Sequence, residues 1–288
     1  MCALSVVLHP IKNIMDIKSF DTRFQIIRIK KIIRENEVTN TYIFDYPLNA
    51  NPGQFVMVWI PGVDEKPMSI AFSDREEFWI TVCKVGGFSS SMHKLKVGDK
   101  VGIRGPFGTH YEIGKKQKIV LVAGGYGVAP MYFAAHEAVS AGCKVDFLMG
   151  ARNKDLLIYT HKILGLGVNL HIATDDGSVG VKGYITEVLE EVLGKGKVDK
   201  VFTCGPEVMM KAVGEISFAK KVPCYVSVEK YMKCGIGVCG QCAIDDTGDL
   251  VCKKGPVMSW DYLRKLPEVG QYHRDAQGKK HYFFKKTV

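Results

Sequence analysis

The sequence predicts a multi-domain β plus α/β protein: an antiparallel β-barrel, then a doubly wound domain on a parallel sheet, then a small cysteine-rich segment. Three observations predict this order. Short β-rich runs separated by turn residues fill positions 22–114, strands alternate with helices over 115–230, and four cysteines crowd into positions 234–252. The 288 residues, 47% of them hydrophobic and 24% charged, suffice for more than one core and exclude disordered and low-complexity classes.

The first domain is predicted from six β-rich runs with turn residues between them. Breaks such as Asn51-Pro52-Gly53 and Gly98-Asp99 have the composition that tight turns prefer. The strands are expected at residues 23–33, 39–46, 54–60, 68–73, 78–85 and 100–104. Because no long helical stretch interrupts them, residues 22–114 are expected to close into a small antiparallel barrel. Residues 1–21 are then an N-terminal extension.

The second domain is predicted from a change of hydrophobic period after residue 114. Strands are expected at residues 118–123, 144–149, 168–173, 200–204 and 223–228, and helices at 128–141, 153–164, 184–193 and 207–219. Such alternation is typical of βαβ units, whose parallel sheet is covered by helices on both faces. Residues 115–230 therefore form the doubly wound domain, and residues 231–288 hold the cysteine loop and a basic tail.

The cysteine loop is the strongest chemical signal in the sequence. Its spacing is C-x4-C-x2-C-x9-C, formed by Cys234, Cys239, Cys242 and Cys252. The C-x4-C-x2-C portion is the plant-type arrangement for a [2Fe–2S] cluster, and the glycines between the thiols let the backbone curl around the inorganic sulfides. Structural zinc is the alternative, but it usually takes two separated pairs of ligands. Four free buried cysteines are a third possibility, which the glycine-rich composition disfavours.

A glycine turn joins the first strand of the second domain to its first helix. It reads Gly124-Gly125-Tyr126-Gly127-Val128-Ala129-Pro130. Glycines let the main chain approach a pyrophosphate, and the following helix offers N–H donors and the positive end of its dipole. No Lys-Ser/Thr pair follows, which excludes a P-loop, and Pro130 stands where the third glycine of G-x-G-x-x-G would be. A tight turn without a ligand remains the alternative.

Two motifs of the barrel and one of the sheet complete the candidate site. Lys66-Pro67-Met68-Ser69 opens a strand, and Gly87, Phe88, Ser89 and Ser90 form a hydroxyl-rich turn. A cation and such a turn suit the diphosphate of a flavin dinucleotide, and each could also be an ordinary loop. Cys204-Gly205-Pro206 ends a predicted parallel strand, where open sheets bind ligands. By itself, Cys204 could equally be a core residue.

Charge and hydropathy limit the partners and the compartment. Of the net charge of +9, residues 253–288 contribute +6, from nine basic and three acidic residues. Such a tail could bind nucleic acid, but no known nucleic-acid motif accompanies it, so we expect its aromatic residues to pack on the body. The apolar runs are too short to cross a membrane, and no secretory signal is recognised. With its clustered thiols, the chain is expected to be cytoplasmic.

Taken together, these motifs resemble the ferredoxin–NADP reductase superfamily, and within it most closely the electron-transfer subunits of NAD-dependent dihydroorotate dehydrogenases. The resemblance covers residues 22–275, and residues 270–278 also look like the tails of archaeal-type members. The motifs that carry it are Lys66-Pro67-Met68-Ser69, Gly87-Phe88-Ser89-Ser90, Gly105-Pro106-Phe107-Gly108, Gly124-Gly125-Tyr126-Gly127-Val128-Ala129-Pro130, Thr174-Asp175-Asp176-Gly177-Ser178, Cys204-Gly205-Pro206 and the cysteine loop.

The resemblance implies three cofactors and their sites. FAD would lie against the barrel, with its diphosphate beside the serine turn. NAD(H) would bind the second domain, with Cys204 as the catalytic residue close to the nicotinamide, and the cluster would take the four cysteines. The cofactor-binding residues are then Lys66, Pro67, Met68, Ser69, Gly87, Phe88, Ser89, Ser90, Gly124, Gly125, Gly127, Asp176, Gly205 and Pro206. Where the family usually has Arg, this chain has Lys66, a point charge without the bidentate fork.

Electron counting gives the expected function. A cluster exchanges one electron and NAD(H) exchanges two as hydride, so a flavin between them converts one into the other. The chain lacks a Ser/His/Asp set and H-E-x-x-H, which agrees with cofactor chemistry. The resemblance implies a hetero-oligomer, a heterotetramer, in which a partner subunit with FMN oxidises dihydroorotate for pyrimidine biosynthesis and electrons pass to NAD+.

Two other functions remain open at this stage. The same motifs resemble NAD(P)H-linked subunits of ferredoxin:NADP oxidoreductase, sulfide dehydrogenase and sulfhydrogenase complexes. A zinc-bearing module that binds nucleic acid through the tail is the alternative of another class. NAD is favoured over NADP by the resemblance, although Arg152, after the second parallel strand, could meet a 2′-phosphate.

Overall fold

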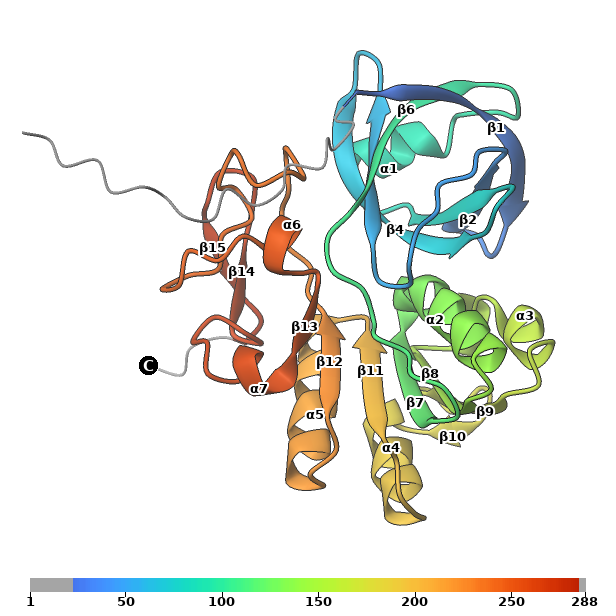
Figure 1. Ribbon diagram of the computed structural model, residues 1–288, viewed down its shortest axis with the longest axis vertical. Helices are drawn as coiled ribbons and strands as arrows, with labels where there is room; N and C mark the ends of the chain where they lie inside the picture. Colours follow the sequence, from blue (N-terminus) through green and yellow to red (C-terminus); the bar gives the residue numbers. More distant parts are fainter. Residues whose placement is uncertain (1–22, 285–288) are drawn as a thin grey trace, which may run out of the picture.

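The structure, a computed structural model, describes residues 23–284, which form three parts (Figure 1). The barrel lies above the α/β domain, and the C-terminal segment lies beside both. The extension predicted at residues 1–21 lies outside the described residues, as does the end of the tail, 285–288. The fold class expected from the sequence is confirmed. Within residues 23–284, no helix is long and apolar enough to cross a membrane.

The barrel is a closed antiparallel sheet with the strand order β1-β2-β5-β4-β3-β6. Its strands are β1 (Gln25–Arg34), β2 (Thr39–Phe44), β3 (Phe55–Ile60), β4 (Asp64–Ser73), β5 (Phe78–Cys83) and β6 (Lys100–Phe107). Burial alternates residue by residue along β5, as expected where one face of a strand points into a barrel. Large apolar side chains such as Tyr42, Phe44 and Phe78 fill the interior.

A short helix, α1 (Gly87–Met92), stands where the sequence predicts only a turn. Its side chains Phe88 and Met92 are buried in the barrel core. Ser89 stabilises its start, because its hydroxyl accepts hydrogen bonds from the N–H groups of Val85 and Gly86, both at 2.9 Å. A serine so placed satisfies donors that a helix N-terminus otherwise leaves unpaired.

The α/β domain is built on a seven-stranded sheet with the order β10-β9-β8-β7-β11-β12-β13. The strands are β7 (Lys118–Gly124), β8 (Lys144–Ala151), β9 (Asn169–Thr174), β10 (Val181–Lys182), β11 (Lys200–Cys204), β12 (Cys224–Ser227) and β13 (Val257–Ser259). All neighbours pair in parallel except β12 and β13. The antiparallel edge strand β13 comes from the C-terminal segment, and the sequence did not indicate it.

Helices cover both faces of this sheet. They are α2 (Val128–Ser140), α3 (Thr160–Leu164), α4 (Ile185–Gly194) and α5 (Glu207–Ala219), with the 3-10 turns η1 (Gly125–Gly127) and η2 (Lys154–Leu156). Alternate side chains of β7 belong to two hydrophobic cores, one on each face of the sheet. Val120 and Val122 pack with α4 and α5, whereas Ile119 and Leu121 pack with α2. Buried on both faces, β7 has the continuous apolar run that the sequence shows.

The prediction of one helix over residues 153–164 is wrong. The structure has the turn η2 and the short helix α3, and between them Tyr159 takes the left-handed conformation, with φ of 65°. The buried Tyr159 hydroxyl lies 2.9 Å from Thr81 Oγ1 and 3.1 Å from Thr41 Oγ1, both in the barrel. This contact between domains outweighs the helical preference of the local sequence.

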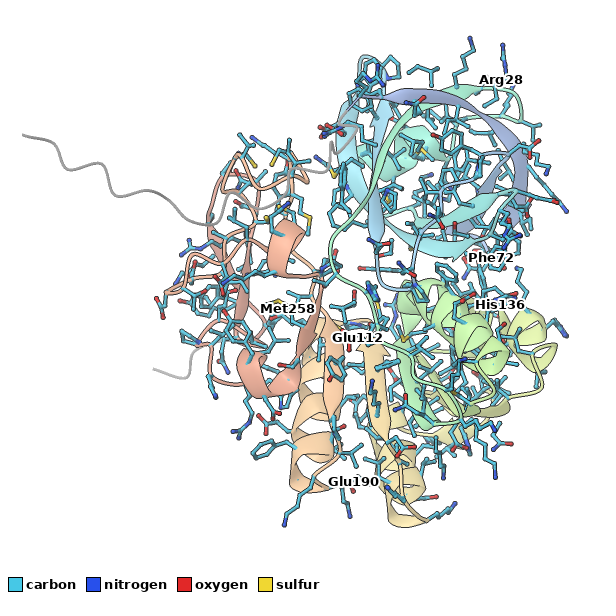
Figure 2. All side chains as sticks on the ribbon, viewed as in Figure 1. Arg28, Phe72, Glu112, His136, Glu190 and Met258 are labelled. Carbon is cyan, nitrogen blue, oxygen red and sulfur yellow. The ribbon has the colours of Figure 1, made fainter. Side chains whose placement is uncertain are left out.

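Aromatic packing fixes the barrel on the α/β domain. The centroid of the Phe72 ring, at the end of β4, lies 5.9 Å from that of Phe133 on α2. It lies 5.1 Å from the centroid of His136 on the same helix (Figure 2). Trp79 stacks on Tyr132 of the same helix, with ring centroids 6.2 Å apart and an interplanar angle of 6°. Such ring contacts stabilise the interface beyond what its buried area alone contributes, so they favour this orientation of the two domains.

The C-terminal segment packs against the open edge of the α/β sheet. After β13 come α7 (Trp260–Leu263) and a hairpin of β14 (Tyr272–Arg274) and β15 (Lys280–Tyr282), and α6 (Val251–Lys254) precedes β13. Trp260 is buried against α5, where a Cβ on Gly214 would overlap the indole ring. Of the tail aromatics expected to pack on the body, Trp260 and Tyr272 are buried, whereas Tyr282 and Phe284 are exposed.

Candidate functional site

The site begins where the strand order of the α/β sheet reverses. Successive strands run outward from β7 through β8 and β9, and the chain then returns to add β11 and β12 on the other side of β7. Ala123 at the end of β7 pairs with Cys204 at the end of β11, so the two turns that follow lie side by side. Open parallel sheets bind ligands at such switch points.

Gly127 allows the two turns to touch. A Cβ on this residue would lie 2.6 Å from the carbonyl carbon of Cys204, which is backbone and cannot move aside. Gly124 likewise lies against Met209 and Pro206 at the start of α5. The predicted residues Gly124, Gly125, Gly127, Cys204, Gly205 and Pro206 are therefore brought together by two adjacent strand ends.

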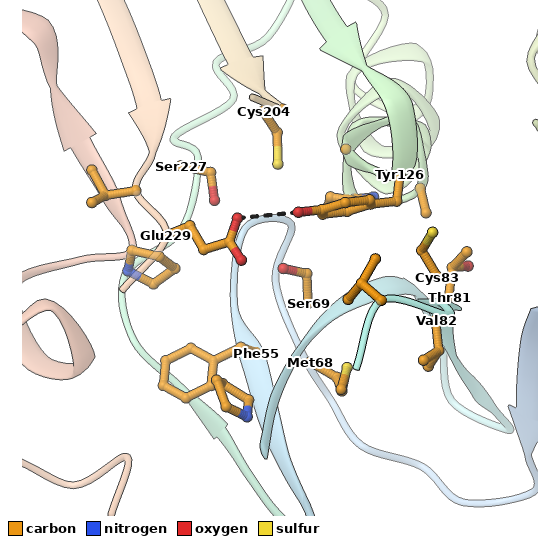
Figure 3. A pocket seen from close by; sticks show the side chains of 18 of the residues that line it. Phe55, Met68, Ser69, Thr81, Val82, Cys83, Tyr126, Cys204, Ser227 and Glu229 are labelled. Carbon is orange, nitrogen blue, oxygen red and sulfur yellow. Dashed lines mark hydrogen bonds between the residues drawn. The ribbon is translucent and has the colours of Figure 1, made fainter. Parts of the chain in front are cut away.

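A cavity of about 220 Å³ separates this sheet edge from the barrel. The barrel contributes Met68 and Ser69 of β4 and Thr81, Val82 and Cys83 of β5. Figure 3 shows these side chains facing Tyr126, Cys204, Ser227 and Glu229 from the α/β domain. A flat ring entering here would have strand backbone on one side and the two sheet turns on the other.

Two residues that line this cavity, Tyr126 and Glu229, were not predicted as site residues from the sequence. The Tyr126 hydroxyl donates to Glu229 Oε2 at 3.3 Å across the cavity (Figure 3). Burial, together with the charge of Glu229, raises the pKa of Tyr126 well above its usual value, so the phenol stays a neutral donor. Glu229 comes two residues after β12, a strand end at the same edge, and that position was the signal available. Tyr126 lies inside a motif that was interpreted for its glycines alone.

The Cys204 thiol points into the cavity and is not an activated nucleophile. Burial raises its pKa to about 12, because a thiolate would lose its hydration there. At neutral pH the group is therefore a protonated, polarisable thiol, which can contact a planar ring but does not form a thiolate.

A second cavity, of about 760 Å³, continues from the first and shares Pro67, Met68 and Ser89 with it. On the barrel side it is lined by Lys66, Gly87 and Phe88 as well. Ser90, the next residue of α1, is outside this lining.

Lys66 is held in place from two directions. It pairs with Asp64, donates to the Tyr231 hydroxyl at 3.1 Å and lies 4.8 Å from the centre of that ring. The Lys66 side chain is about one-quarter exposed and borders the larger cavity, so a ligand anion can reach it.

Asp176 lies apart from these cavities. It follows β9, two strands away from β7, where its carboxylate accepts a hydrogen bond from Ser178 N–H at 2.9 Å. Hydrogen bonds from the Ser178 hydroxyl and, to a lesser extent, from this N–H lower the pKa of Asp176. Arg152 follows β8, between them. Both residues are at the carboxyl edge of the sheet, but the structure does not bring Asp176 into the lining that Cys204 shares.

The four cysteines of the loop are arranged as two pairs. Cys234 and Cys239 are hydrogen-bonded neighbours, as are Cys242 and Cys252. Within residues 23–284, no three His, Cys, Asp or Glu side chains are grouped so as to hold a single metal ion. Two pairs suit a [2Fe–2S] cluster, in which each iron takes two protein thiolates beside the bridging sulfides, better than one tetrahedral zinc.

Backbone N–H groups favour thiolates in this loop. Burial alone would raise the pKa of Cys234, but the N–H groups of Cys239, Ile236 and Val238 outweigh it and lower that pKa to about 7. The hydrogen bond with Cys252 lowers the pKa of Cys242 and raises that of Cys252. Deprotonated sulfur is the form that binds iron, and the same N–H groups can stabilise charge on a bound cluster.

Arg104 of β6 joins the cysteine loop to the barrel. Its buried guanidinium donates to Glu65 Oε1, at 2.8 Å from Nε, and to the carbonyl oxygen of Cys234 at 3.1 Å. Glu65 lies on β4, one residue before Lys66. The strand that lines both cavities is therefore tied directly to the first cysteine.

Family models match two parts of the chain. Residues 229–264 match the iron–sulfur cluster binding domain of dihydroorotate dehydrogenase B, and residues 121–215 match an oxidoreductase NAD-binding domain. The first match spans the whole cysteine loop, and the second spans both turns at the switch point.

Whole-chain similarity extends to curated and solved proteins. Two relatives are named "Probable dihydroorotate dehydrogenase B (NAD(+)), electron transfer subunit". The one from Methanocaldococcus jannaschii is 48% identical, covering 90% of this chain and 98% of that protein. The one from Methanothermobacter thermautotrophicus is 43% identical, covering 89% and 96%. A solved NADH-dependent reduced ferredoxin-NADP oxidoreductase, described for flavin-based electron bifurcation, matches with a TM-score of 0.75 and 29% identity over 83% of this chain and 92% of that one.

Proposed function

Because this chain belongs to the family of electron-transfer subunits of dihydroorotate dehydrogenase B (NAD(+)), we propose that it carries electrons from dihydroorotate oxidation to NAD+. A partner subunit that holds FMN would perform the oxidation, in pyrimidine biosynthesis, within a hetero-oligomer. One observation carries the proposal: a loop of paired thiols is tied by Arg104 to the strand that lines the flavin-sized cavities.

The barrel would hold FAD. When bound, FAD exchanges single electrons with an iron–sulfur cluster and electron pairs, as hydride, with NAD(H). Lys66 and the first residues of α1, Gly87, Phe88 and Ser89, would bind the diphosphate in the larger cavity. Pro67, Met68 and Ser69 would border the ring in the smaller one, and Ser90 would act from α1. The fit rests on an accessible cation, a turn rich in N–H groups and strand backbone along the cavity wall.

The switch point would hold NAD(H). Gly127 and Gly205 would keep the two turns in contact so that the dinucleotide backbone lies along them, with Gly124, Gly125 and Pro206 shaping them. Asp176 would contact the dinucleotide from the end of β9. Cys204 would be the catalytic residue that contacts the nicotinamide, keeping the ring close while its protonated thiol excludes water. Tyr126 and Glu229 would orient the carboxamide, because one donates and the other accepts hydrogen bonds at the same place.

The loop of Cys234, Cys239, Cys242 and Cys252 would hold the [2Fe–2S] cluster, one pair of thiolates to each iron. The pairs are preformed, and N–H groups already face Cys234. This arrangement disfavours the alternative of a zinc module that binds nucleic acid. Clustered thiols of this kind are typical of a reducing compartment, which supports a cytoplasmic location.

A second candidate is the NAD(P)H-linked subunit of a ferredoxin:NADP oxidoreductase, to which the solved structure above is similar. The greater identity to the dihydroorotate dehydrogenase relatives, 48% against 29%, favours the first. The partner decides between them: an FMN-bearing dihydroorotate dehydrogenase subunit should co-purify with the native chain.

The test is anaerobic purification of the native complex with cofactor, acid-labile sulfide and subunit analysis. We expect FAD, FMN, two irons and two sulfides per cluster, and flavin and cluster bands that NADH bleaches and dihydroorotate also bleaches. A complex bleached by NADH or NADPH but not by dihydroorotate would assign the second candidate. A colourless protein with stoichiometric zinc would overturn both.

A further inference from the structure

The C-terminal hairpin of β14 and β15 forms one wall of the larger cavity. Five residues of the hairpin and its flanks line the cavity across from Lys66 and the residues before α1. They are His273, Arg274, Asp275, Ala276 and Phe283. These residues lie far in sequence from the barrel; they do not line the smaller cavity beside Cys204 and contribute no thiol to the cysteine loop. A tail that serves only to cover apolar surface would not need to border a cavity of this size.

The hairpin presents aromatic rings to the cavity. His273 pairs directly with His281 across the two strands, and their rings stack with centroids 5.3 Å apart and an interplanar angle of 15°. The Phe283 ring lies 5.5 Å from His273. His273 and Phe283, which line the cavity and are backed by His281, are called the aromatic face below. Nucleic-acid bases stack on such faces irrespective of their identity, because every base is planar.

The opposite side of the hairpin is anchored, so this wall exists before any ligand binds. Asp245, three residues after Cys242, accepts hydrogen bonds from the Tyr272 hydroxyl at 2.5 Å and from Arg274 Nη2 at 2.8 Å. Lys280 Nζ lies 3.3 Å from the same carboxylate. A preformed wall costs a ligand less ordering entropy than a loop that must fold around it.

The larger cavity is lined by as many cations as carboxylates, and each carboxylate has a hydrogen-bond partner in the structure. Asp275 contacts His281 at 2.8 Å, Glu229 accepts from Tyr126, and Glu207 accepts from Gly270 N–H at 2.7 Å. The cations are Lys66, Lys230 and Arg274, each in an ion pair with Asp64, Glu268 or Asp245 respectively.

We propose that the aromatic face binds the adenosine half of FAD. The inference rests on the proposed flavin site and extends it. Going outward from the sheet edge, the smaller cavity fits the isoalloxazine ring, Lys66 and the start of α1 fit the diphosphate, and the aromatic face fits the base. The adenosine of NAD does not compete for it, because its expected contacts at the ends of β8 and β9 lie on the other side of β11 from the tail.

FAD and FMN distinguish this contact, because FMN has the same ring but no adenosine. The full chain, purified anaerobically with its cluster intact and then stripped of flavin, is titrated with each flavin and followed by flavin fluorescence. In the double variant His273→Ala and Phe283→Ala, we expect the Kd for FAD to rise about 5- to 150-fold, the range given by loss of base stacking. The Kd for FMN should stay unchanged.

Phe284→Ala is the matched control, because Phe284 is the next residue, is exposed and does not line the cavity. It should change neither Kd. If the double variant loses its cluster absorbance, His273→Gln with Phe283→Leu replaces it, since both keep the hairpin's bulk without aromatic rings. Unchanged FAD binding, or equal weakening of FAD and FMN, would overturn the inference. A wild-type chain that binds FMN as tightly as FAD would overturn it while sparing the flavin function, and one that binds neither flavin would overturn both.

Discussion

At the scale of single residues, Cys204 shows how burial sets reactivity. With a pKa of about 12, its thiolate fraction at pH 8 is about 10⁻⁴, against about one-quarter for an ordinary thiol of pKa about 8.5. We therefore expect iodoacetamide to alkylate Cys204 about a thousandfold more slowly than glutathione, and the rate to rise about tenfold per pH unit between pH 7 and 9.5. Peptide mapping by mass spectrometry measures this rate. A plateau above pH 8.5 would contradict the assignment of a buried, protonated thiol.

Substitutions of Lys66 test whether its single point charge suffices to bind the FAD diphosphate, at a position where an Arg was expected from the resemblance. Removing the ammonium in Lys66→Met should raise the Kd for FAD about 10- to 100-fold, because hydrogen bonds to charged groups are stronger than neutral ones. Lys66→Arg should bind FAD at least as tightly as the natural chain, since the fork can bind two phosphate oxygens. Fluorescence titration of the flavin-stripped chain compares the three. Equal affinities in Lys66→Met and the natural chain would remove Lys66 from the site.

At the scale of secondary-structure elements, the sheet edge depends on one close backbone contact. In Gly127→Ala the new methyl group meets the Cys204 carbonyl, so the ends of β7 and β11 must separate. Overpacking of this kind costs about 1–3 kcal/mol, which should lower the Tm by about 3–10 °C and weaken NADH binding. Gly125→Ala is the control, because its Cβ meets nothing within 4 Å and only the positive φ of 54° opposes it. A greater loss in Gly125→Ala than in Gly127→Ala would contradict this account.

The elements that the sequence predicts well are those whose own pattern decides their structure. The runs that became β2, β5, β7 and β11 are rich in β-branched, aromatic and other apolar residues, and turn residues or polar segments bound them. Two elements could not be found in this way. β13 has three residues and exists because the edge of β12 accepts it, and the helix expected at 153–164 is broken because Tyr159 bonds to the barrel. In both cases the deciding partner lies far away in the sequence.

The same distinction holds for the site. The glycine turn, Cys204 and the cysteine loop are local motifs, and their chemistry can be interpreted from spacing alone. Glu229 and Tyr126 meet only because β12 and β7 end at one edge with β11 between them. The hairpin that borders the larger cavity is held there by hydrogen bonds from Tyr272 and Arg274 to Asp245. These partners are about 30 positions apart in sequence. No local pattern reports such meetings, because each is made by the topology.

At the scale of the whole molecule, the three parts that would hold the cofactors are joined by side-chain and strand contacts. The ring contacts of Phe72 and Trp79 on α2 fix the barrel, and β13 adds the C-terminal segment to the sheet. Arg104 closes this frame between the barrel and the cysteine loop. We expect the rate of electron transfer between the proposed sites to depend on these contacts, because they set how the parts lie against one another.

Arg104→Met tests this dependence. Without the guanidinium, the Cys234 carbonyl and Glu65 lose their shared donor, and the cysteine loop is free to shift against β4 and β6. Because removing groups that support metal ligands commonly costs 10- to 100-fold in activity or metal affinity, we expect cluster bleaching by NADH to slow at least about tenfold. The earlier flavin phase should keep its rate, as stopped-flow absorbance can resolve. Arg28→Met is the control, because Arg28 bonds to Gly98 on the same barrel but lies far from the loop (Figure 2). If both variants bleach like the natural chain, the Arg104 contact does not govern transfer between the two sites.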